Sequence, residues 1–269
     1  MMREGGRRLL GIERRQYILD FLRKHKSVEV SFLSDELGVS EVTVRKDLEK
    51  LERDRLVVRS HGGAVLSAGL LAEPSFVEKD DQFAEEKNAI ALEASILVGD
   101  GVTVALATGT SVGRLALRLL DRTGLTVVTN AVNIATTFMP HEAEVFLTGG
   151  TIRPHTYGLV GEVAERALDG VMCDFAFIGT NGVSLERGLT TPNMEEARVV
   201  RAMMNSARRV VLLADHTKFA HVGFYRIAPA ERVHMIITDS KAPADEVERL
   251  RGAGVEVRVV SARPERRGS

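Results

Sequence analysis

Short runs of β-forming residues alternate with stretches of helical periodicity from about residue 83 to residue 260, and this alternation constrains the fold most. Strands that alternate with helices predict a mainly parallel sheet that is covered on both faces. Ligands of such sheets bind beyond the carboxyl ends of the strands. We therefore expect a large α/β domain at 83–260 with a binding site along that edge. The strand-like runs are VTVALA, LTVVT, EVFLTGG, DFAFIGT, RRVVLLAD, VHMIITD and VEVRVV.

The preceding residues predict a smaller domain at 11–66, made of three short helices and a hairpin. Apolar spacing predicts helices around 12–25 and 31–37, and Gly38 ends the second because glycine tolerates a positive φ. Ser40 is a favoured N-cap for the third helix. The last two helices form a helix-turn-helix over about 28–47. The following LVVRSHGGAVL has two β-rich runs around His-Gly-Gly, which predict a hairpin like the wing of a winged helix. Residues 67–82 lose periodicity and predict a linker.

The third helix, SEVTVRKDLEKL, presents a valine among its charged residues. Val44 and Leu48 lie on its apolar face, which leaves Val42 on the polar face beside Arg45 and Lys46. An ordinary amphipathic helix with one stray valine has the same pattern. In the second helix of a helix-turn-helix, however, valine contacts a thymine methyl, arginine a guanine or phosphate, and lysine a phosphate. The N-cap and the wing favour DNA binding. The candidate DNA-binding residues are Ser40, Val42, Thr43, Arg45, Lys46, Lys50, Arg59 and His61.

These motifs resemble the winged helix of the DeoR family of bacterial transcriptional regulators. The resemblance covers most of 14–66 and is carried by Arg14, Ile18, Leu22, the run Ser40-x-x-Thr43-Val44-Arg45-Lys46-Asp47-Leu48, Leu51-Glu52 and Arg59-x-His61-Gly62-Gly63-Ala64. Lys46 stands where many members have a second arginine. Lysine keeps the positive charge but lacks the planar guanidinium group that can form two parallel hydrogen bonds. We expect Asp47 to be structural and to pair with an arginine of the first helix. Arg59 and His61 either meet DNA phosphate or minor groove, or belong to a plain solvated hairpin.

Charge and composition add little to this assignment. The chain has 269 residues and a net charge of −1, but residues 1–66 hold 14 basic and 11 acidic residues, a net +3. No apolar run reaches the about 18 residues that cross a bilayer, and no signal peptide is predicted, so we expect a cytoplasmic protein. The single Cys173 excludes an internal disulfide, and no cysteine or histidine spacing predicts a metal site. We expect no metal, no cofactor and no membrane partner.

Small polar loops follow the predicted strands of the larger domain. Thr108-Gly109-Thr110-Ser111 stands between a strand and a helix, where backbone N–H groups favour an anion such as phosphate. A simple turn with Ser111 as N-cap is the alternative. If the strands are parallel, the other loops converge on the same edge. Those loops are Thr129-Asn130-Ala131, Thr148-Gly149-Gly150, Gly179-Thr180-Asn181-Gly182 and Ala214-Asp215-His216-Thr217-Lys218-Phe219. The polar run of Arg153, His155 and Tyr157 either closes over a ligand or is solvated.

Residues 83–260 resemble the DeoR-family sensor domain, which is similar to ribose-phosphate isomerase and its relatives that bind phosphorylated sugars. The resemblance implies a phosphate loop at 108–111, a sugar-facing Asn181, an acidic residue among Glu195 and Glu196, of which we take Glu195, and Lys218 near the phosphate. The isomerases carry acidic residues where this chain has Asn181, and an amide cannot act as a general base. Binding without turnover is therefore favoured. The candidate effector-binding residues are Thr108, Gly109, Thr110, Ser111, Thr129, Asn130, Gly149, Gly150, Asn181, Glu195 and Lys218.

We accordingly expect a DNA-binding regulator, a repressor of carbohydrate-metabolism genes, that a phosphorylated sugar or related metabolite releases or modulates. One alternative is a sugar-phosphate isomerase-like enzyme with a DNA-binding arm. Another is a DNA-binding scaffold whose larger domain only oligomerises. We expect double-stranded operator DNA as partner and a homodimer or higher homo-oligomer, because symmetric half-sites give a small module enough contacts.

Overall fold

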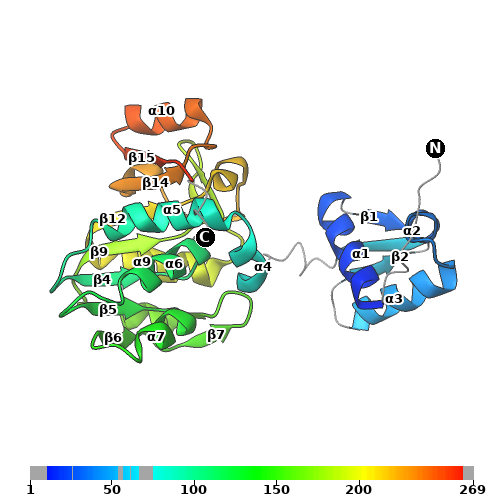
Figure 1. Ribbon diagram of the computed structural model, residues 1–269, viewed down its shortest axis with the longest axis horizontal. Helices are drawn as coiled ribbons and strands as arrows, with labels where there is room; N and C mark the ends of the chain where they lie inside the picture. Colours follow the sequence, from blue (N-terminus) through cyan, green and yellow to red (C-terminus); the bar gives the residue numbers. More distant parts are fainter. Residues whose placement is uncertain (1–10, 26, 54–56, 61, 67–74, 263–269) are drawn as a thin grey trace, which may run out of the picture. The chain divides into compact units, whose positions relative to one another are not determined.

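The computed structural model describes residues 11–25, 27–53, 57–60, 62–66 and 75–262, apart from a few side chains of the first helix. The chain divides into two compact units, Met1–Glu73 and Pro74–Ser269, which we describe separately (Figure 1). No described helix is long and apolar enough to cross a membrane.

The N-terminal unit packs three helices against a small antiparallel sheet with the strand order β1-β3-β2. Its core is aliphatic and includes Ile18, Leu22, Leu33 and Leu48. The helix-turn-helix and the hairpin lie where the sequence predicts them, and Gly38 caps α2 at a φ of 62°. The pairing of β1 with the hairpin is an addition that the sequence did not indicate. The elements are α1 Gly11–His25, β1 Ser27–Glu29, α2 Val30–Leu37, α3 Glu41–Arg53, β2 Val57–Ser60 and β3 Gly63–Leu66.

The C-terminal unit is built on a seven-stranded sheet with the order β15-β14-β12-β9-β4-β5-β6. Every neighbouring pair within it is parallel. The predicted fold class, a winged helix followed by a mainly parallel α/β domain, is therefore confirmed. The strands are β4 Thr103–Leu106, β5 Thr126–Thr129, β6 Glu144–Leu147, β9 Cys173–Ile178, β12 Ala207–Leu213, β14 Met235–Asp239 and β15 Glu256–Val260.

Helices cover both faces of this sheet. Val104 and Leu106 of β4 pack with α5, α6 and α7 on one face, whereas Ala105 packs with α8, α9 and α10 on the other. Burial of alternate residues on both faces explains why these strands are almost continuously apolar in the sequence. The helices are α5 Ala84–Ser95, α6 Thr110–Arg118, α7 Val132–Phe138, α8 Glu162–Arg166, α9 Met194–Asn205 and α10 Ala244–Gly252.

Several short elements interrupt the alternation of strands and helices. A hairpin, β7–β8, follows β6, and a small antiparallel sheet has the order β10-β11-β13. The short helix α4 precedes α5, and two 3-10 turns follow β12 and β13. The linker predicted at 67–82 therefore extends too far, because α4 lies within that stretch and belongs to the C-terminal unit. These elements are α4 Phe76–Asp81, β7 Thr151–Arg153, β8 Gly158–Val160, β10 Gly182–Ser184, β11 Gly188–Thr191, η1 His216–Ala220, β13 Tyr225–Ala228 and η2 Ala230–Arg232.

Candidate functional site

The orientation of α3 follows from its N-cap and its buried face. The Thr43 amide donates to Ser40 Oγ at 3.3 Å, so Ser40 supplies the expected cap. Val44 and Leu48 are buried, and Val39 packs against the same core as Val44, which fixes the start of the helix as a hydrophobic staple does. Val42 is consequently turned outward and is 63% exposed.

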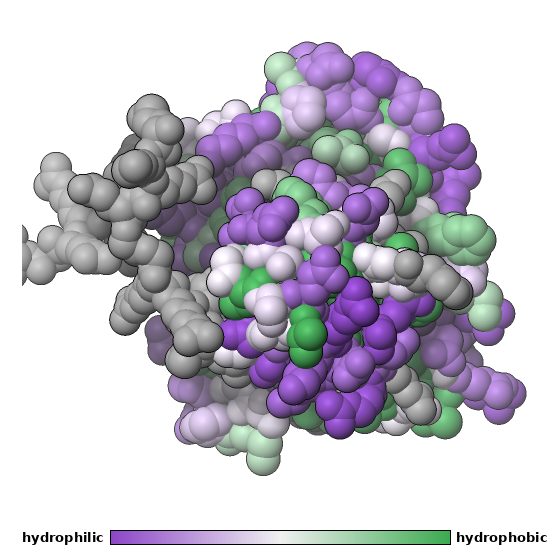
Figure 2. Space-filling model, turned by 90° about the vertical axis from the view of Figure 1, so that its right-hand side faces the viewer, coloured by the Kyte–Doolittle hydropathy of each residue, from purple (hydrophilic) through white to green (hydrophobic). Residues whose placement is uncertain are grey.

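The cations of α3 lie on the same outward surface as Val42. Arg45 Nη2 is 2.9 Å from Glu41 Oε2, and both side chains are about half exposed. Lys46 and Lys50 are exposed as well. An exposed ion pair one helical turn apart contributes only about 0.3–0.5 kcal/mol, so an incoming phosphate or base can replace Glu41 at low cost. The face drawn in Figure 2 is mostly hydrophilic, with small apolar areas between the hydrophilic ones.

The wing is tied to α3 through Arg59. Its Nη1 atom is 3.2 Å from Glu49 Oε1 and 3.9 Å from Glu52 Oε2. Gly63 begins β3 where a Cβ atom would meet the Val28 carbonyl oxygen, so only glycine lets the wing approach β1. His61, the other predicted wing contact, lies outside the described residues.

Asp47 joins α1 to α3 from inside the N-terminal unit. It is buried, and it accepts from Arg14 Nε at 2.8 Å and from Arg15 Nη1 at 3.2 Å. This is the structural pairing that the sequence analysis expected. Val42, Arg45, Lys46 and Lys50 remain exposed on the outward surface of α3.

In the C-terminal unit, the predicted loops lie at the carboxyl ends of parallel strands, as expected. The sheet has its topological switch point at β4, because the chain continues from β4 to β5 on one side and later adds β9 on the other. Two loops meet there: a Cβ atom built on Gly179 would lie 3.3 Å from the Thr108 carbonyl oxygen, and one on Gly109 would lie 3.9 Å from Gly179 Cα.

The loop at 108–111 leads directly into α6. Gly109 is the N-cap of α6, with a φ of 140° and no side-chain cap, so Ser111 is a residue within the helix and is not its cap. Thr110 and Ser111 are both buried. The first N–H groups of a helix have no intrahelical partner and carry partial positive charge. The loop therefore offers N–H groups and hydroxyls to an anion.

Three of the other candidate residues shape the edge loops. Thr129 Oγ1 donates to the Leu106 carbonyl at 2.6 Å and accepts from the Ala131 amide at 3.0 Å, so its hydroxyl is already engaged. Gly149 has a φ of 72°. A Cβ atom on Gly150 would lie 2.6 Å from the Val160 carbonyl oxygen. These residues build the edge through backbone geometry and internal hydrogen bonds.

Asn130 and Asn181 differ in how their polar groups are used. Asn130 is buried and its Nδ2 donates to the Leu159 carbonyl at 3.1 Å. Its Oδ1 atom has no hydrogen-bond partner among the described residues. A buried acceptor of this kind is costly unless a ligand or water satisfies it. Asn181 is partly exposed, and its backbone amide donates to the Thr190 carbonyl at 3.1 Å.

Of the two adjacent carboxylates on α9, the structure buries Glu196 and exposes Glu195. Glu196 accepts from Thr156 Oγ1 at 2.9 Å and from Thr191 Oγ1 at 3.2 Å, and it is ion-paired with Arg153. The N-cap Asn193 determines this outcome, because it places Glu196 in the third helical position with its amide bonded to Asn193 Oδ1. Glu196 is thus the carboxylate held among the edge loops.

The run of Arg153, His155 and Tyr157 is fastened to its surroundings. Arg153 pairs with Glu196, the His155 carbonyl accepts from the Phe76 amide at 2.7 Å, and the Tyr157 ring lies 5.5 Å from the Phe76 ring. The Tyr157 carbonyl also accepts from the amide of Val132. The run connects α4, α7 and α9 at the edge.

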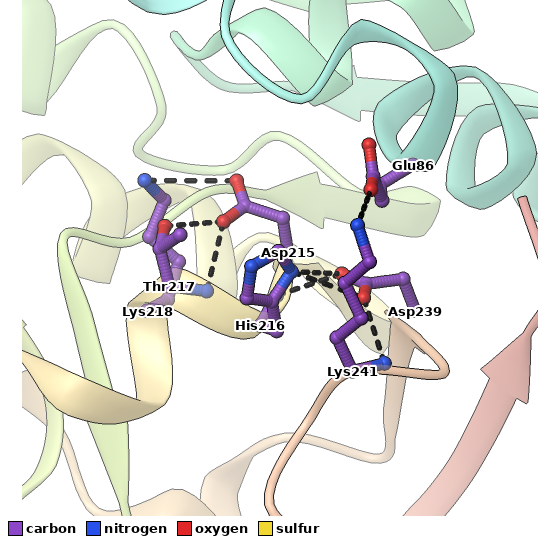
Figure 3. Close-up of polar contacts among 7 residues, drawn as sticks. All are labelled: Glu86, Asp215, His216, Thr217, Lys218, Asp239 and Lys241. Atoms are coloured by element: carbon purple, nitrogen blue, oxygen red, sulfur yellow. Dashed lines mark hydrogen bonds and ion pairs between the residues drawn. The ribbon is translucent and has the colours of Figure 1, made fainter.

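Lys218 approaches a buried carboxylate on η1 (Figure 3). Its Nζ atom is 3.6 Å from Asp215 Oδ2, and the Thr217 amide donates to Asp215 Oδ1 at 3.0 Å. Burial raises the pKa of Asp215, but Lys218, the hydrogen bond from Thr217 and Lys87 together hold that pKa below its ordinary value. Asp215 is therefore a carboxylate between two ammonium groups.

A neighbouring set of contacts joins η1 to β14 and α5 (Figure 3). His216 Nδ1 is 3.0 Å from Asp239 Oδ1, and the Lys241 amide donates to the same oxygen at 2.9 Å. Lys241 Nζ donates to Glu86 Oε1 at 2.6 Å, and this bond lowers the pKa of Glu86 despite its burial. The set fixes η1 relative to the start of α5.

Lys87 is not among the site residues predicted from the sequence, although it is the most buried lysine described and only 3% exposed. Burial lowers its pKa to about 8, and Asp215 opposes that shift. A signal was present, because Lys87 shares one helical face with Ile90, Ala91 and Ala94 at spacings of three, four and seven. A lysine on the apolar face of a helix is rare unless a partner or function retains it.

Within the residues that the structure describes, no group of three or more His, Cys, Asp or Glu side chains is arranged to hold a metal ion. The chemistry available at the sheet edge is therefore that of N–H groups, hydroxyls, amides, ammonium groups and carboxylates. Such a set can bind an anionic, polyhydroxylated molecule through hydrogen bonds and charge.

Comparisons with solved structures return distant likenesses. Ribose 5-phosphate isomerase A from Methanocaldococcus jannaschii is 20% identical, with a TM-score of 0.38, covering 49% of this chain and 53% of that chain. The eIF2B beta structure from Chaetomium thermophilum is 14% identical, with a TM-score of 0.38, covering 54% of this chain and 42% of that chain. Likenesses at this level carry no argument about activity.

Comparisons of sequence are far more specific. The model of the DeoR-like helix-turn-helix domain matches residues 14–68, and that of the DeoR C terminal sensor domain matches residues 82–240. The HTH-type transcriptional regulator GlpR of Haloferax volcanii is 37% identical, covering 93% of this chain and 98% of its own. The HTH-type transcriptional repressor GlcR of Bacillus subtilis is 34% identical, covering 92% and 95%. The resemblance seen in the sequence is thereby confirmed, and the chain belongs to the DeoR family of transcriptional regulators.

Proposed function

We propose that this chain is a repressor of carbohydrate-metabolism genes, which binds operator DNA through α3 and the wing and is released by a phosphorylated sugar bound at the sheet edge. One observation carries the sensing half of this proposal. An uncapped helix N-terminus follows β4 at the switch point of the parallel sheet, a buried unsatisfied amide oxygen follows β5, and two ammonium groups flank Asp215 after β12 at the same edge. Relatives named as a repressor, GlcR, and as a regulator, GlpR, support the regulatory half.

On the DNA side, α3 enters the major groove. Val42 contacts a thymine methyl, Arg45 pairs with a guanine, and Lys46 and Lys50 contact phosphates, with Ser40 and Thr43 at the start of the helix. The exposure of Val42 and the weak pairing of Arg45 with Glu41 support these roles. Arg59 exchanges Glu49 for a DNA phosphate.

On the effector side, the loop at 108–111 holds the phosphate, and Lys218 adds a positive charge. Asn130 Oδ1 and the Asn181 side chain hydrogen-bond sugar hydroxyls. We assign the acidic role to Glu196 in place of Glu195, because Glu196 is buried among the loops and Glu195 faces solvent. Thr129, Gly149 and Gly150 shape the loops around the ligand.

The isomerase alternative is not favoured. The relatives are regulators, and Asn181 supplies an amide where proton transfer in an isomerase needs a carboxylate. Glu196, the buried carboxylate at the edge, is neutralised by Arg153 and two hydroxyls, which suits binding better than proton abstraction. We also propose that the chain acts as a homodimer or larger homo-oligomer, because a single winged helix contacts only one half-site.

The test begins with a thermal-shift panel of pentose and hexose phosphates, since a ligand that binds the folded state raises its melting temperature. Operator affinity is then measured with and without the sugar phosphate that gives the largest shift. We expect Thr110→Asp to bind operator like the wild type but to lose the thermal shift and the release, because its carboxylate repels the phosphate. Thr136→Asp, an exposed threonine on α7 of the same unit, is the matched control and should respond normally. Normal release of Thr110→Asp would place the phosphate elsewhere.

A further inference from the structure

The short helix α4 lies at the C-terminal end of the stretch predicted as a linker, 67–82, and few contacts hold it in place. It has six residues, none of them buried. Ser75 caps it with a capping box, in which the Ser75 amide donates to Glu78 Oε2 at 2.8 Å and the Glu78 amide donates to Ser75 Oγ at 3.3 Å. A segment with little buried apolar surface opens at low free-energy cost. Its position therefore depends on a few specific contacts.

Those contacts are made with the loop between β7 and β8 and with the helices α5 and α6. Phe76 is bonded to the loop between β7 and β8, and its ring would lie 3.5 Å from a Cβ atom on Gly113 of α6. Arg114 of α6 donates from Nη2 to the Asp80 carbonyl at 2.8 Å and pairs with the Asp80 carboxylate at 3.1 Å. Lys87 of α5 donates from Nζ to the Lys79 carbonyl. Thus α4 is held by the same helices and loop that surround the candidate effector site.

Lys87 differs from the other contacts because its charge also acts on the effector site. Its ammonium is close enough to Asp215 and Lys218 for their charges to interact. Asp215 is the carboxylate that both ammonium groups share, and its Oδ2 atom has no hydrogen-bond partner among the described residues. An ammonium has three donors, so Lys87 can change partners without losing its burial. A phosphate bound beside Lys218 would add negative charge within reach of Lys87.

We propose that Lys87 is a further effector-binding residue and that it couples the effector to α4, an inference that rests on the proposed function. In the free chain its ammonium donates to the Lys79 carbonyl and holds the C-terminal turn of α4. When a phosphate group occupies the loop at 108–111, the ammonium turns to the phosphate and α4 loses that bond. The segment that joins the DNA-binding unit to α4 is then attached to a less constrained helix. We expect this change to lower the affinity of the DNA-binding unit for the operator.

Energetics favour this exchange. The Lys79 carbonyl oxygen carries only a partial negative charge, whereas a phosphate oxygen carries a full one, so the ammonium gains Coulomb attraction when it moves to the phosphate. Burial has also lowered the pKa of Lys87 to about 8, so a nearby anion stabilises the charged form. The new bond to the phosphate thus offsets the loss of the bond to the Lys79 carbonyl. The effector therefore binds more tightly to the state in which Lys87 has released α4 than to the state in which Lys87 holds it.

The experiment is hydrogen–deuterium exchange of the full-length wild-type chain with and without the sugar phosphate that gives the largest thermal shift, with inorganic phosphate as a second probe. We expect the ligand to slow exchange in residues 108–113 and to speed it in residues 78–83 by several-fold. In Lys87→Met, exchange at 78–83 should be fast already and unchanged by ligand, and ligand affinity should fall. Operator release should shrink from the about 5- to 150-fold range typical of allosteric coupling toward none.

Val77→Thr is the matched control, because Val77 is an exposed residue of α4 and its substitution keeps the Lys79 carbonyl that Lys87 contacts. It should exchange and release like the wild type. If the sugar phosphate binds the wild type and protects 108–113 but leaves 78–83 unchanged or slower, the coupling role of Lys87 is wrong and the proposed function stands. If no sugar phosphate binds the wild type, the proposed effector site fails and this inference fails with it. The wild-type measurement decides both without depending on the folding of any variant.

Discussion

The charged side chains of α3 and those at the sheet edge differ in their exposure and in their partners. On α3, Arg45 and Glu41 are both about half exposed, and their pair is one that a DNA phosphate or base can displace cheaply. At the sheet edge, Lys87 and Asp215 are buried, and each charge is compensated before any ligand arrives. A ligand can therefore bind α3 with little rearrangement, whereas a ligand at the edge must redistribute partners. Under the proposed function, this difference lets α3 bind DNA directly, whereas the sheet edge changes its contacts when the effector binds.

Asp47 lies on α3 but is buried, unlike the exposed charges of that helix. Asp47→Asn removes the carboxylate that Arg14 and Arg15 share, and we expect it to cost about 3 kcal/mol of stability, because breaking a buried ion pair leaves its partners uncompensated. Calorimetry of the full chain should show the transition of the N-terminal unit at a lower temperature and that of the C-terminal unit unchanged. Asp35→Asn, an exposed aspartate on α2, is the control. Equal shifts for the two variants would show that Asp47 is not a structural centre.

Burial makes the contribution of Lys87 to stability depend on pH. Its pKa is about 8 in the folded chain, against about 10.4 for an unfolded lysine. Below both values the lysine is charged in both states, and the full cost of burying that charge is present. As the pH rises from about 8 to about 10.4, the folded chain releases its proton first, so the free energy of unfolding increases.

We expect the wild type to gain about 2 kcal/mol over Lys87→Met across this pH window. Urea denaturation of both chains at the two ends of the window measures the gain, and other groups that titrate there cancel in the difference. A constant difference between wild type and Lys87→Met would mean that Lys87 is not charged and buried in the folded chain.

Substitutions on α3 test whether its exposed charges act independently. Arg45→Ala should weaken operator binding by about 1–3 kcal/mol and leave binding to scrambled DNA nearly unchanged, as expected for a base contact. Lys46→Ala should weaken both and lower the salt slope by about one, as expected for a phosphate contact. Titrations of both DNAs at several salt concentrations separate the two roles. Equal losses for Arg45→Ala on both DNAs would overturn its assignment to a base.

The smallest effect belongs to Val42. Val42→Ala should relax the preference for thymine at one operator position by less than about 1 kcal/mol, because only a methyl contact is lost. Affinities for operators with each base at that position measure the change, and stability should be unaffected because the side chain is exposed. If specificity is unchanged, Val42 is an ordinary exposed valine.

Local periodicity accounts for what the sequence predicted well. The spacing of Val44 and Leu48 orients α3, and with it the exposure of Val42, because both depend on the geometry of a single helix. The convergence of the edge loops followed from the rule that parallel strands end at the same edge. Both inferences need only repeating geometry and no knowledge of distant partners.

The details of the edge depend on partners far apart in the sequence. Glu195 and Glu196 differ by one helical position, and only the cap at Asn193 and the hydroxyls of Thr156 and Thr191 reveal which one is buried. Lys87 and Asp215 interact electrostatically although about half the chain separates them in the sequence. β1 is a three-residue strand whose partner lies more than 30 residues later. Such pairings leave no periodic signal, so short-range patterns could not predict them.

The strand order of the large sheet has a consequence for how the chain folds during synthesis. β4 is made first and lies inside the sheet, and every later strand pairs with one that has already been made: β5 with β4, β6 with β5, β9 with β4, β12 with β9, β14 with β12 and β15 with β14. No strand of this sheet has to wait for a partner still on the ribosome. The sheet can grow outward from its oldest member, with few unpaired strand edges exposed while it grows.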